Sequence, residues 1–314
     1  MLPYSLSDLR LALENPIEVV TELNRLYYTR LRTWDYNRTA PNFFEQDWDN
    51  LIILDACRFD TLSRVLEEDN ISLIGDLSTI ESRGACTPEF LRGCLPESDL
   101  SDTVYVTGTT MLYRNSVLND ELNHNLHAVI DAWEDSIDVG EWGVSPDRME
   151  QKARETLDSY PNKRLVVHFI QPHIPFIGEF GRKRFSDAPE DIWSAIRYGK
   201  LNVSDEELWQ AYNENLREVL PATRRLLEDL PGKTVVTADH GQLIGDRVGP
   251  IPVRDYGHPN GIYCDELVKV PWLVHENGPR REIVNEDRSV EYDEKERDEL
   301  DEKAKEHLEN LGYM

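Results

Sequence analysis

The stretch NLIILDACRFD, from Asn50 to Asp60, places four consecutive apolar residues directly before an aspartate. A strand with one face in water alternates polar and apolar residues, whereas an unbroken apolar run of this length is typical of a strand covered on both faces. Such strands belong to parallel sheets with helices on either side. The stretch therefore predicts a buried parallel strand that is followed at once by the carboxylate of Asp55.

Four more apolar runs follow along the chain, and helical segments separate them. The runs are VYVTG from Val104, RLVVHFIQPH from Arg164, KTVVTADHG from Lys233 and LVKVPWLVHE from Leu267. Residues 148–160 and 205–230 between them are predicted to be helices. Strands that alternate with helices predict an α/β fold, in which a mostly parallel central sheet is flanked by helices in a three-layer architecture.

The chain of 314 residues is expected to form one main domain with two flanking segments. Residues 46–278 hold all five apolar runs and make up that domain. Residues 1–45 are expected to be a helical segment packed on the core, with a helix over 5–33. Residues 279–314 are highly charged and are predicted to be an acidic helical tail.

The charge of the chain excludes some classes of partner. Sixty acidic against 34 basic side chains give a formal net charge of −26, the opposite sign from that of a nucleic-acid-binding protein. Self-repulsion of this size is tolerable where high salt screens it, so we expect a halophilic source. The four cysteines have neither metal-finger nor C-x-x-C spacing, which favours reduced thiols and a cytoplasmic location.

The N-terminal segment carries no sign of membrane insertion. It lacks the basic and apolar regions of a signal peptide, and no stretch of the chain offers the roughly 20 apolar residues of a membrane span. Three arginines in the expected N-terminal helix leave open a second interpretation, peripheral contact with a membrane surface: Arg25, Arg30 and Arg32.

Polar side chains appear where three of the apolar runs end. Asp55 ends the first run, Asp239 and His240 end the fourth, and His173 follows the third, which also contains His168. Ligands of this fold class bind outside the carboxyl ends of the strands. Carboxylate and imidazole ligands suit Mn²⁺, Mg²⁺, Zn²⁺ or iron, with Ca²⁺ as a further candidate, so the sequence predicts a divalent metal site there.

The stretch ESRGACTPEF, residues 81–90, offers two nucleophiles in adjacent positions, Cys86 and Thr87. It also reads as a helix start, with Thr87 as the N-cap, Pro88 as the first helical residue and Glu89 in the first turn. The two interpretations are compatible. A hydroxyl at a helix N-terminus lies among unpaired N–H groups that favour developing negative charge, and a nearby cation would make it more acidic.

Taken in order, these segments resemble the alkaline phosphatase/sulfatase superfamily. NLIILDACRFDTL resembles its first metal-ligand strand, SRGACTPEFL its nucleophile segment and HFIQPHIPF its substrate-side segment. KTVVTADHGQLIGD resembles the second metal-ligand strand, and YGHPNGIYCDELVKVPWLV the segment that closes the site. The ending LENLGYM resembles the close of sulfatase-like chains. The resemblance implies an alkaline-phosphatase-like fold, with residues 46–278 as the catalytic domain.

The resemblance also implies roles for individual residues. The metal ligands would be Asp55, Asp239, His240 and Thr87. His173 and His258 would face the anionic group of the substrate, and His258 could instead bind a second ion. Arg58 and Arg83 are candidates for binding that anion through their guanidinium groups, with ordinary ion pairs as the alternative for both.

Departures from the sulfatase pattern favour a phosphoryl enzyme. Sulfatases have a second aspartate where this chain has Ala56, and an asparagine where it has His240. Their modified cysteine needs an arginine where this chain has Phe90. The Asp-His pair resembles instead the branch of phosphoesterases, phosphonate hydrolases and lipoteichoic-acid-synthase-like enzymes, which favours Thr87 over Cys86 as the nucleophile.

The resulting expectation is a metal-dependent hydrolase or transferase of phosphate-type esters that acts through a covalent intermediate. Two alternatives stay open, a sulfuric ester hydrolase with a modified Cys86 and a degenerate, non-catalytic binding protein. The arginine and aromatic content of residues 178–201 hints at an anionic substrate linked to a glycan or a lipid.

Overall fold

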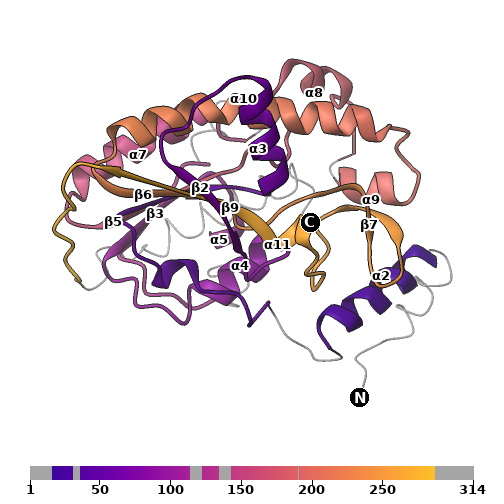
Figure 1. Cartoon of the computed structure of the whole chain (residues 1–314), viewed down its shortest axis with the longest axis horizontal. Helices are drawn as coiled ribbons and strands as arrows, with labels where there is room; N and C mark the ends of the chain where they lie inside the picture. Colours follow the sequence, from indigo (N-terminus) through magenta and orange to yellow (C-terminus); the bar gives the residue numbers. More distant parts are fainter. Residues whose placement is uncertain (1–15, 31–35, 114–121, 134–142, 190, 287–314) are drawn as a thin grey trace, which may run out of the picture.

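A central sheet of seven strands organises the described part of the chain. The computed structural model describes residues 16–30, 36–113, 122–133, 143–189 and 191–286. The strands lie in the order β2-β9-β6-β1-β5-β3-β4 across the sheet (Figure 1). Their bounds are Asp76–Glu81 for β2, Lys269–Asn277 for β9, Gly232–Thr237 for β6, Asn50–Leu54 for β1, Arg164–Phe169 for β5, Thr103–Thr107 for β3 and Ala128–Asp131 for β4.

The middle of the sheet is parallel, as the apolar runs predicted. β1 pairs in parallel with β5 and β6, and β3 pairs in parallel with β5 and β4. β9 differs, because it runs antiparallel to both β6 and β2. All five residues of β1 and β3 are buried, whereas no residue of β2 is, so β2 at the edge gave no apolar signal in the sequence.

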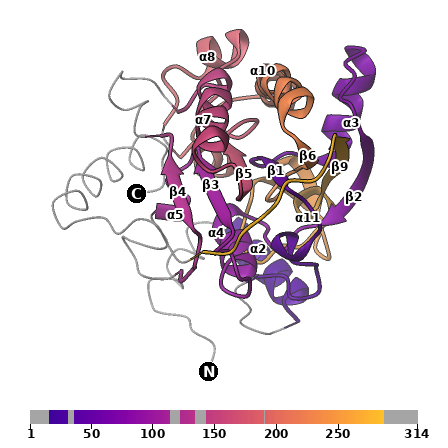
Figure 2. The same cartoon turned by 90° about the vertical axis from the view of Figure 1, so that its left-hand side faces the viewer.

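Helices cover both faces of the sheet (Figure 2). One face carries α3 (Phe59–Glu68), α7 (Pro146–Ser159), α8 (Glu179–Arg184) and α10 (Asp205–Asp229). The other carries α4 (Thr87–Cys94), α5 (Met111–Tyr113) and α11 (Asp265–Val268). α10 begins with a capping box between Ser204 and Glu207, which satisfies backbone N–H groups of its first turn. The helices and the sheet enclose one large apolar core that includes Phe43, Phe44 and Trp48.

A short hairpin of β7 (Leu243–Val248) and β8 (Val253–Gly257) extends beyond the sheet, and α2 (Pro16–Tyr28) lies against it. α2 lies within the predicted helix over 5–33, whose remaining residues lie largely outside the described part of the chain. Asn24 joins the two by donating from Nδ2 to the carbonyl oxygens of Val248 and Ile251. No helix in the described ranges is both long and apolar enough to cross a membrane.

The chain continues past β9 along the opposite end of the sheet from the strand ends that carry Asp55 and Asp239. Residues 279–286 form no helix there. Arg281 donates to the carbonyl oxygens of Asp49 and Lys163, which lie next to the starts of β1 and β5. Residues 287–314 lie outside the described part, so a helical tail over those residues stays a prediction. Residues 279–286 are exposed or partly exposed, and Arg281 joins them to the starts of β1 and β5.

Candidate active site and metal centre

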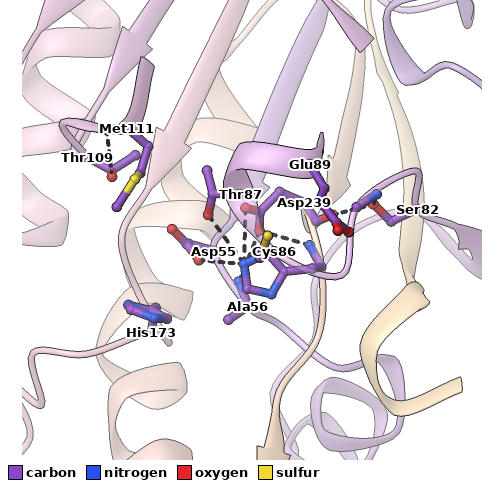
Figure 3. A network of polar contacts seen from close by, with 12 residues as sticks. Asp55, Ala56, Ser82, Cys86, Thr87, Glu89, Thr109, Met111, His173 and Asp239 are labelled. Carbon is purple, nitrogen blue, oxygen red and sulfur yellow. Dashed lines mark hydrogen bonds and ion pairs between the residues drawn. The ribbon is translucent and has the colours of Figure 1, made fainter. Parts of the chain in front are cut away.

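The carboxyl ends of β1 and β6 bring three of the predicted ligands together. Asp55 directly follows β1, and Asp239 and His240 follow β6 after one further residue. The two strands are parallel neighbours in which Ile53 is paired with Thr237, so the chain leaves both strands at the same edge of the sheet. All three residues are buried, with at most 3% of their surface exposed. The fourth predicted ligand, Thr87, lies beside them (Figure 3).

Thr87 is the first residue of α4, not its N-cap as the sequence suggested. Cys86 occupies the N-cap position in an extended conformation, with φ −152° and ψ 163°, and Pro88 comes second in the helix. Because Thr87 does not cap the helix, its hydroxyl is available for another contact. Its Oγ1 lies 3.3 Å from Nε2 of His240 and the residue is buried, which places a hydroxyl at a helix start inside the predicted ligand set.

The backbone fixes the orientation of the His240 ring. Its Nδ1 lies 2.7 Å from the carbonyl oxygen of Gly241, which can only accept, so Nδ1 carries the proton. The lone pair of Nε2 then points at the cluster, 3.5 Å from Oδ1 of Asp55 and 3.4 Å from Oδ2 of Asp239. This is the tautomer that a metal-binding imidazole needs.

Asp55 and Asp239 each have one carboxylate oxygen that lies near Nε2 of His240 and has no hydrogen-bond partner in the described part of the chain. Asp239 Oδ1 accepts hydrogen bonds from the backbone N–H groups of Ala56 and His240, at 3.1 and 2.9 Å. Two other oxygens, Oδ2 of Asp239 and Oδ1 of Asp55, have no hydrogen-bond partner among the described residues. Burial and the facing charge of Asp239 raise the pKa of Asp55 well above its usual value. Two buried carboxylates this close repel each other unless a positive charge lies between them.

The separations between these atoms fit a shared cation. Nε2 of His240 is 3.3–3.5 Å from Thr87 Oγ1, Asp239 Oδ2 and Asp55 Oδ1, longer than a good hydrogen bond. A cation with bonds of about 2.0–2.1 Å in a tetrahedral site holds its ligand atoms about 3.4 Å apart. The unpaired buried oxygens, the free imidazole lone pair and these separations are what a divalent metal site requires.

His168 is a member of the cluster that the sequence did not assign. It lies in β5 and is 1% exposed, and one ligand atom each from Asp55, His168 and Asp239 lie within 4.8 Å of one another. Its Nδ1 lies 2.8 Å from the hydroxyl of Tyr105 in the neighbouring β3. A histidine inside an otherwise apolar strand was the available signal, because a buried imidazole needs polar partners.

Both substrate-side histidines are brought to the cluster. The ring of His258 is stacked on that of His240 with centroids 4.8 Å apart, and the ring of His173 meets His258 edge-on at 5.0 Å. His173 donates from Nδ1 to its neighbour's carbonyl oxygen at 2.9 Å. Burial lowers the pKa of His173 to about 4 and that of His258 well below its usual value, so both imidazoles are neutral at neutral pH.

The two candidate anion-binding arginines are instead held in ion pairs. The Arg58 guanidinium binds Asp60 and Asp246 at 2.6 and 2.8 Å, and it lies over the ring of Trp209. Arg83 pairs with Glu97 at 2.7 Å and donates to backbone carbonyl oxygens. The alternative of ordinary ion pairs therefore describes both arginines.

The surroundings of Cys86 do not favour a reactive thiolate. Its thiol donates to Oδ1 of Asn260 over 2.9 Å. Burial, followed by the charge of Glu89, raises the pKa of the thiol well above its usual value, so it stays protonated at neutral pH. A reactive cysteine needs the opposite environment, one that stabilises the thiolate.

Glu89 is a second residue whose role the sequence did not reveal. Its Oε2 accepts from the N–H of Ala85 at 2.9 Å and its Oε1 from the N–H of Gly261 at 2.8 Å. Burial raises its pKa to about 7, against the effect of these two hydrogen bonds. The side chain joins the start of α4, which carries Thr87, to the segment that carries His258.

We expect Glu89→Ala to lower the free energy of unfolding by about 2 kcal/mol or more, because it leaves two buried N–H groups without an acceptor. Glu89→Gln keeps one acceptor oxygen and should lose less. Urea unfolding followed by circular dichroism measures both. Glu67→Ala on an exposed part of α3 is the matched control and should change little. Equal stability of Glu89→Ala and the wild type would contradict the bridging role.

Comparison with known proteins gives matches at the level of structure alone. No family model matches the chain, and no curated protein matches it. One similar structure is the integral membrane protein lipooligosaccharide phosphoethanolamine transferase A from Neisseria meningitidis, with 14% identity and a TM-score of 0.47. That match covers 71% of this chain and 47% of the transferase, so this chain spans about half the length of that protein.

Two further structures show similar values. The C-terminal periplasmic domain of EcEptC from Escherichia coli, in complex with zinc, has 14% identity, a TM-score of 0.43 and coverage of 76% of this chain and 75% of that one. A protein in the alkaline phosphatase superfamily from Vibrio parahaemolyticus has 14% identity, a TM-score of 0.40 and coverage of 83% and 70%.

The chain's own architecture agrees with the order of its sequence segments. The two ligand segments end adjacent parallel strands, the Thr87 segment opens a helix beside them, and the segments of His173 and His258 complete the same cluster. A mostly parallel sheet with helices on both faces carries all of them. The described part of the chain thus has the α/β fold that its segments predicted, a mostly parallel central sheet with helices on both faces.

Proposed function

We propose that the protein is a metal-dependent hydrolase or transferase of phosphate-type esters with Thr87 as its nucleophile. One observation carries the proposal. The Thr87 hydroxyl, at the start of a helix, lies 3.3 Å from an imidazole nitrogen that also faces two buried carboxylate oxygens without hydrogen-bond partners. A structural helix start needs no such surroundings, whereas phosphoryl transfer to a side chain does.

Asp55, Asp239, His240 and Thr87 would hold the cation, and the chemistry of this donor set fits Mn²⁺, Mg²⁺ or Zn²⁺. When bound, a divalent ion supplies positive charge that lowers the pKa of the Thr87 hydroxyl and offsets the charge of the phosphoryl oxygens. The residues of the chain contribute the orientation. Gly241 fixes the His240 tautomer, and Ala56 N–H holds the carboxylate of Asp239.

In the proposed reaction Thr87 Oγ1 forms a bond to phosphorus while the bond from phosphorus to the leaving oxygen breaks. His258, which burial keeps neutral and whose ring lies against His240, accepts the hydroxyl proton and returns it to the leaving oxygen. Water or an acceptor hydroxyl then attacks the phospho-threonine and releases Thr87. The start of α4 offers N–H groups to the negative charge that develops in both steps.

A substrate screen tests the proposal. Purified protein with Mn²⁺ in high salt is offered phosphomonoesters, phosphodiesters, phosphonates and sulfate esters, with and without an acceptor alcohol. We expect turnover of a phosphate-type ester, abolished by chelation, because the donor set suits a divalent ion. Turnover of sulfate esters alone, together with the mass loss and missing thiol of a converted Cys86, would establish the sulfatase alternative. If the protein shows no turnover and Mn²⁺ does not raise its melting temperature, the alternative of a non-catalytic binding protein is favoured.

A further inference from the structure

A buried pair of side chains, Tyr105 and His168, lies behind the two carboxylates. Tyr105 is 0% and His168 1% exposed, and they come from the neighbouring strands β3 and β5. The Tyr105 hydroxyl is 2.8 Å from His168 Nδ1. On the other side of the ring, His168 Nε2 is 3.9 Å from Oδ2 of Asp55 and 3.8 Å from Oδ2 of Asp239. The imidazole therefore lies between a phenol and two acids.

The tautomer of His168 follows from counting hydrogens. If Nδ1 carried the proton, it would donate to the Tyr105 oxygen, and the Tyr105 hydrogen would be left buried without an acceptor among its recorded contacts. The lone pair of Nε2 would then face two carboxylate oxygens, which is repulsive. If Tyr105 donates to Nδ1 instead, the hydroxyl hydrogen has an acceptor and Nε2–H faces the two acids, which attract it although neither is within hydrogen-bond distance.

We propose that Tyr105 and His168 form a hydrogen-bond relay in which His168 is a positioning residue for the carboxylates of Asp55 and Asp239, rather than a ligand of the cation. Tyr105 donates to Nδ1, and Nε2–H is shared between the two acids. The relay rests on the proposed function of this cluster as a metal site.

The relay gives the unpaired carboxylates a defined orientation. Each Nε2-to-oxygen separation is about 0.7–1 Å longer than a hydrogen bond, so the N–H is poised between the acids and a small shift completes a bond to either one. An N–H group in this position reduces the repulsion between the carboxylates. It faces Oδ2 of Asp55, whose other oxygen faces His240, and Oδ2 of Asp239, which faces His240 as well. Partners of this kind orient ligating groups, and their loss typically weakens metal binding about 10- to 100-fold.

The tautomer can be read without any measurement of activity. Metal-free full-length protein labelled with ¹⁵N-histidine is titrated with Zn²⁺, and the His168 signals are assigned by their loss in His168→Gln. We expect Nε2 of His168 to carry the proton both before and after saturation with Zn²⁺. An Nδ1–H tautomer, or a proton lost from Nε2 when Zn²⁺ binds, would make His168 a ligand and overturn the relay.

Two pairs of variants separate positioning from ligation, with Zn²⁺ affinity measured by competition with a chelating dye. His168→Gln places an amide N–H near the position of Nε2 and should bind Zn²⁺ within a few-fold of the wild type, whereas His168→Leu should bind about 10- to 100-fold more weakly. Equal, large losses in both would indicate a ligand. Tyr105→Phe should raise the Nδ1–H population of His168, whereas Tyr160→Phe, at the end of α7 with its ring against His127, should not.

Failure of the relay and failure of the proposed function give different results. A protein that binds Zn²⁺ and turns over a phosphate ester, but with His168 as an Nδ1–H tautomer, keeps the function and loses the relay. A protein with the Nε2–H tautomer and no metal-dependent turnover keeps the hydrogen-bond arrangement and loses the proposed reaction. If His168→Leu does not fold, the spectra of the wild type and of Tyr105→Phe still decide the tautomer.

Discussion

Thr87→Ala is expected to lower turnover of a phosphate ester by at least a thousandfold, which corresponds to about 4 kcal/mol of transition-state stabilisation. The variant removes Oγ1, the atom of Thr87 that lies 3.3 Å from Nε2 of His240. The helix itself should survive, because Thr87 does not serve as its N-cap. Steady-state turnover, with folding checked by circular dichroism, measures the effect.

Two neighbouring variants serve as controls for the assignment of the nucleophile. Thr87→Ser keeps a hydroxyl at the same carbon and should retain much of the turnover. Cys86→Ala removes a thiol that is protonated and hydrogen-bonded to Asn260, so it should change stability slightly and turnover little. Near wild-type turnover by Thr87→Ala, or a collapse of turnover in Cys86→Ala, would transfer the role to Cys86 and overturn the proposed mechanism.

Asp239→Asn is expected to lower the stability of the metal-free protein and to remove its response to Mn²⁺. In the metal-free protein the substitution removes one of two buried, facing carboxylates, and Asn Oδ1 can still accept from Ala56 and His240. Against the effect of burial, His240 and His168 lower the pKa of Asp239, so the variant should unfold at a lower temperature than the wild type when a chelator is present. It should also lose the stabilisation by Mn²⁺, which reaches about 2.7 kcal/mol when the ion is present at 100 times its dissociation constant.

Asp246→Asn is the matched control for that experiment. Asp246 is paired with the buried Arg58 at 2.8 Å, so its loss leaves a buried guanidinium with one partner fewer. We expect this variant to melt at a lower temperature while its response to Mn²⁺ is unchanged. Thermal melting of the three proteins with chelator and with Mn²⁺ gives the comparison. A full Mn²⁺ shift in Asp239→Asn would show that the ion binds elsewhere.

The sequence predicted the parts of the site that depend on strand ends. Asp55, Asp239 and His240 follow apolar runs, and parallel neighbours must release their chains at the same edge of the sheet. Contacts between residues that are far apart in the sequence leave no comparable pattern in it. Glu89 reads as a first-turn acid, and its contact with Gly261, 172 positions away, exists only after folding.

The ion pair of Arg58 and the direction of β9 also depend on long-range contacts that the sequence does not reveal. Arg58 is close to Asp55 in the sequence, but its guanidinium is paired with Asp246, which lies in the β7–β8 hairpin. β9 contains an apolar run between polar ends, and nothing in its composition records that it pairs antiparallel with β6. Local patterns thus predict which residues face the interior, and long-range partners decide what the residues do there.

The antiparallel strand β9 also has a consequence for the order in which the protein can be assembled on the ribosome. Among the described strands β2 pairs with β9 alone, and β2 leads directly into the segment of Thr87, where Ser82 N–H donates to the Val268 carbonyl oxygen. Residues 76–87 leave the ribosome long before residues 268–277 exist. The segment that carries Thr87 therefore gains its contact with the start of β9 only after residue 268 has been synthesised.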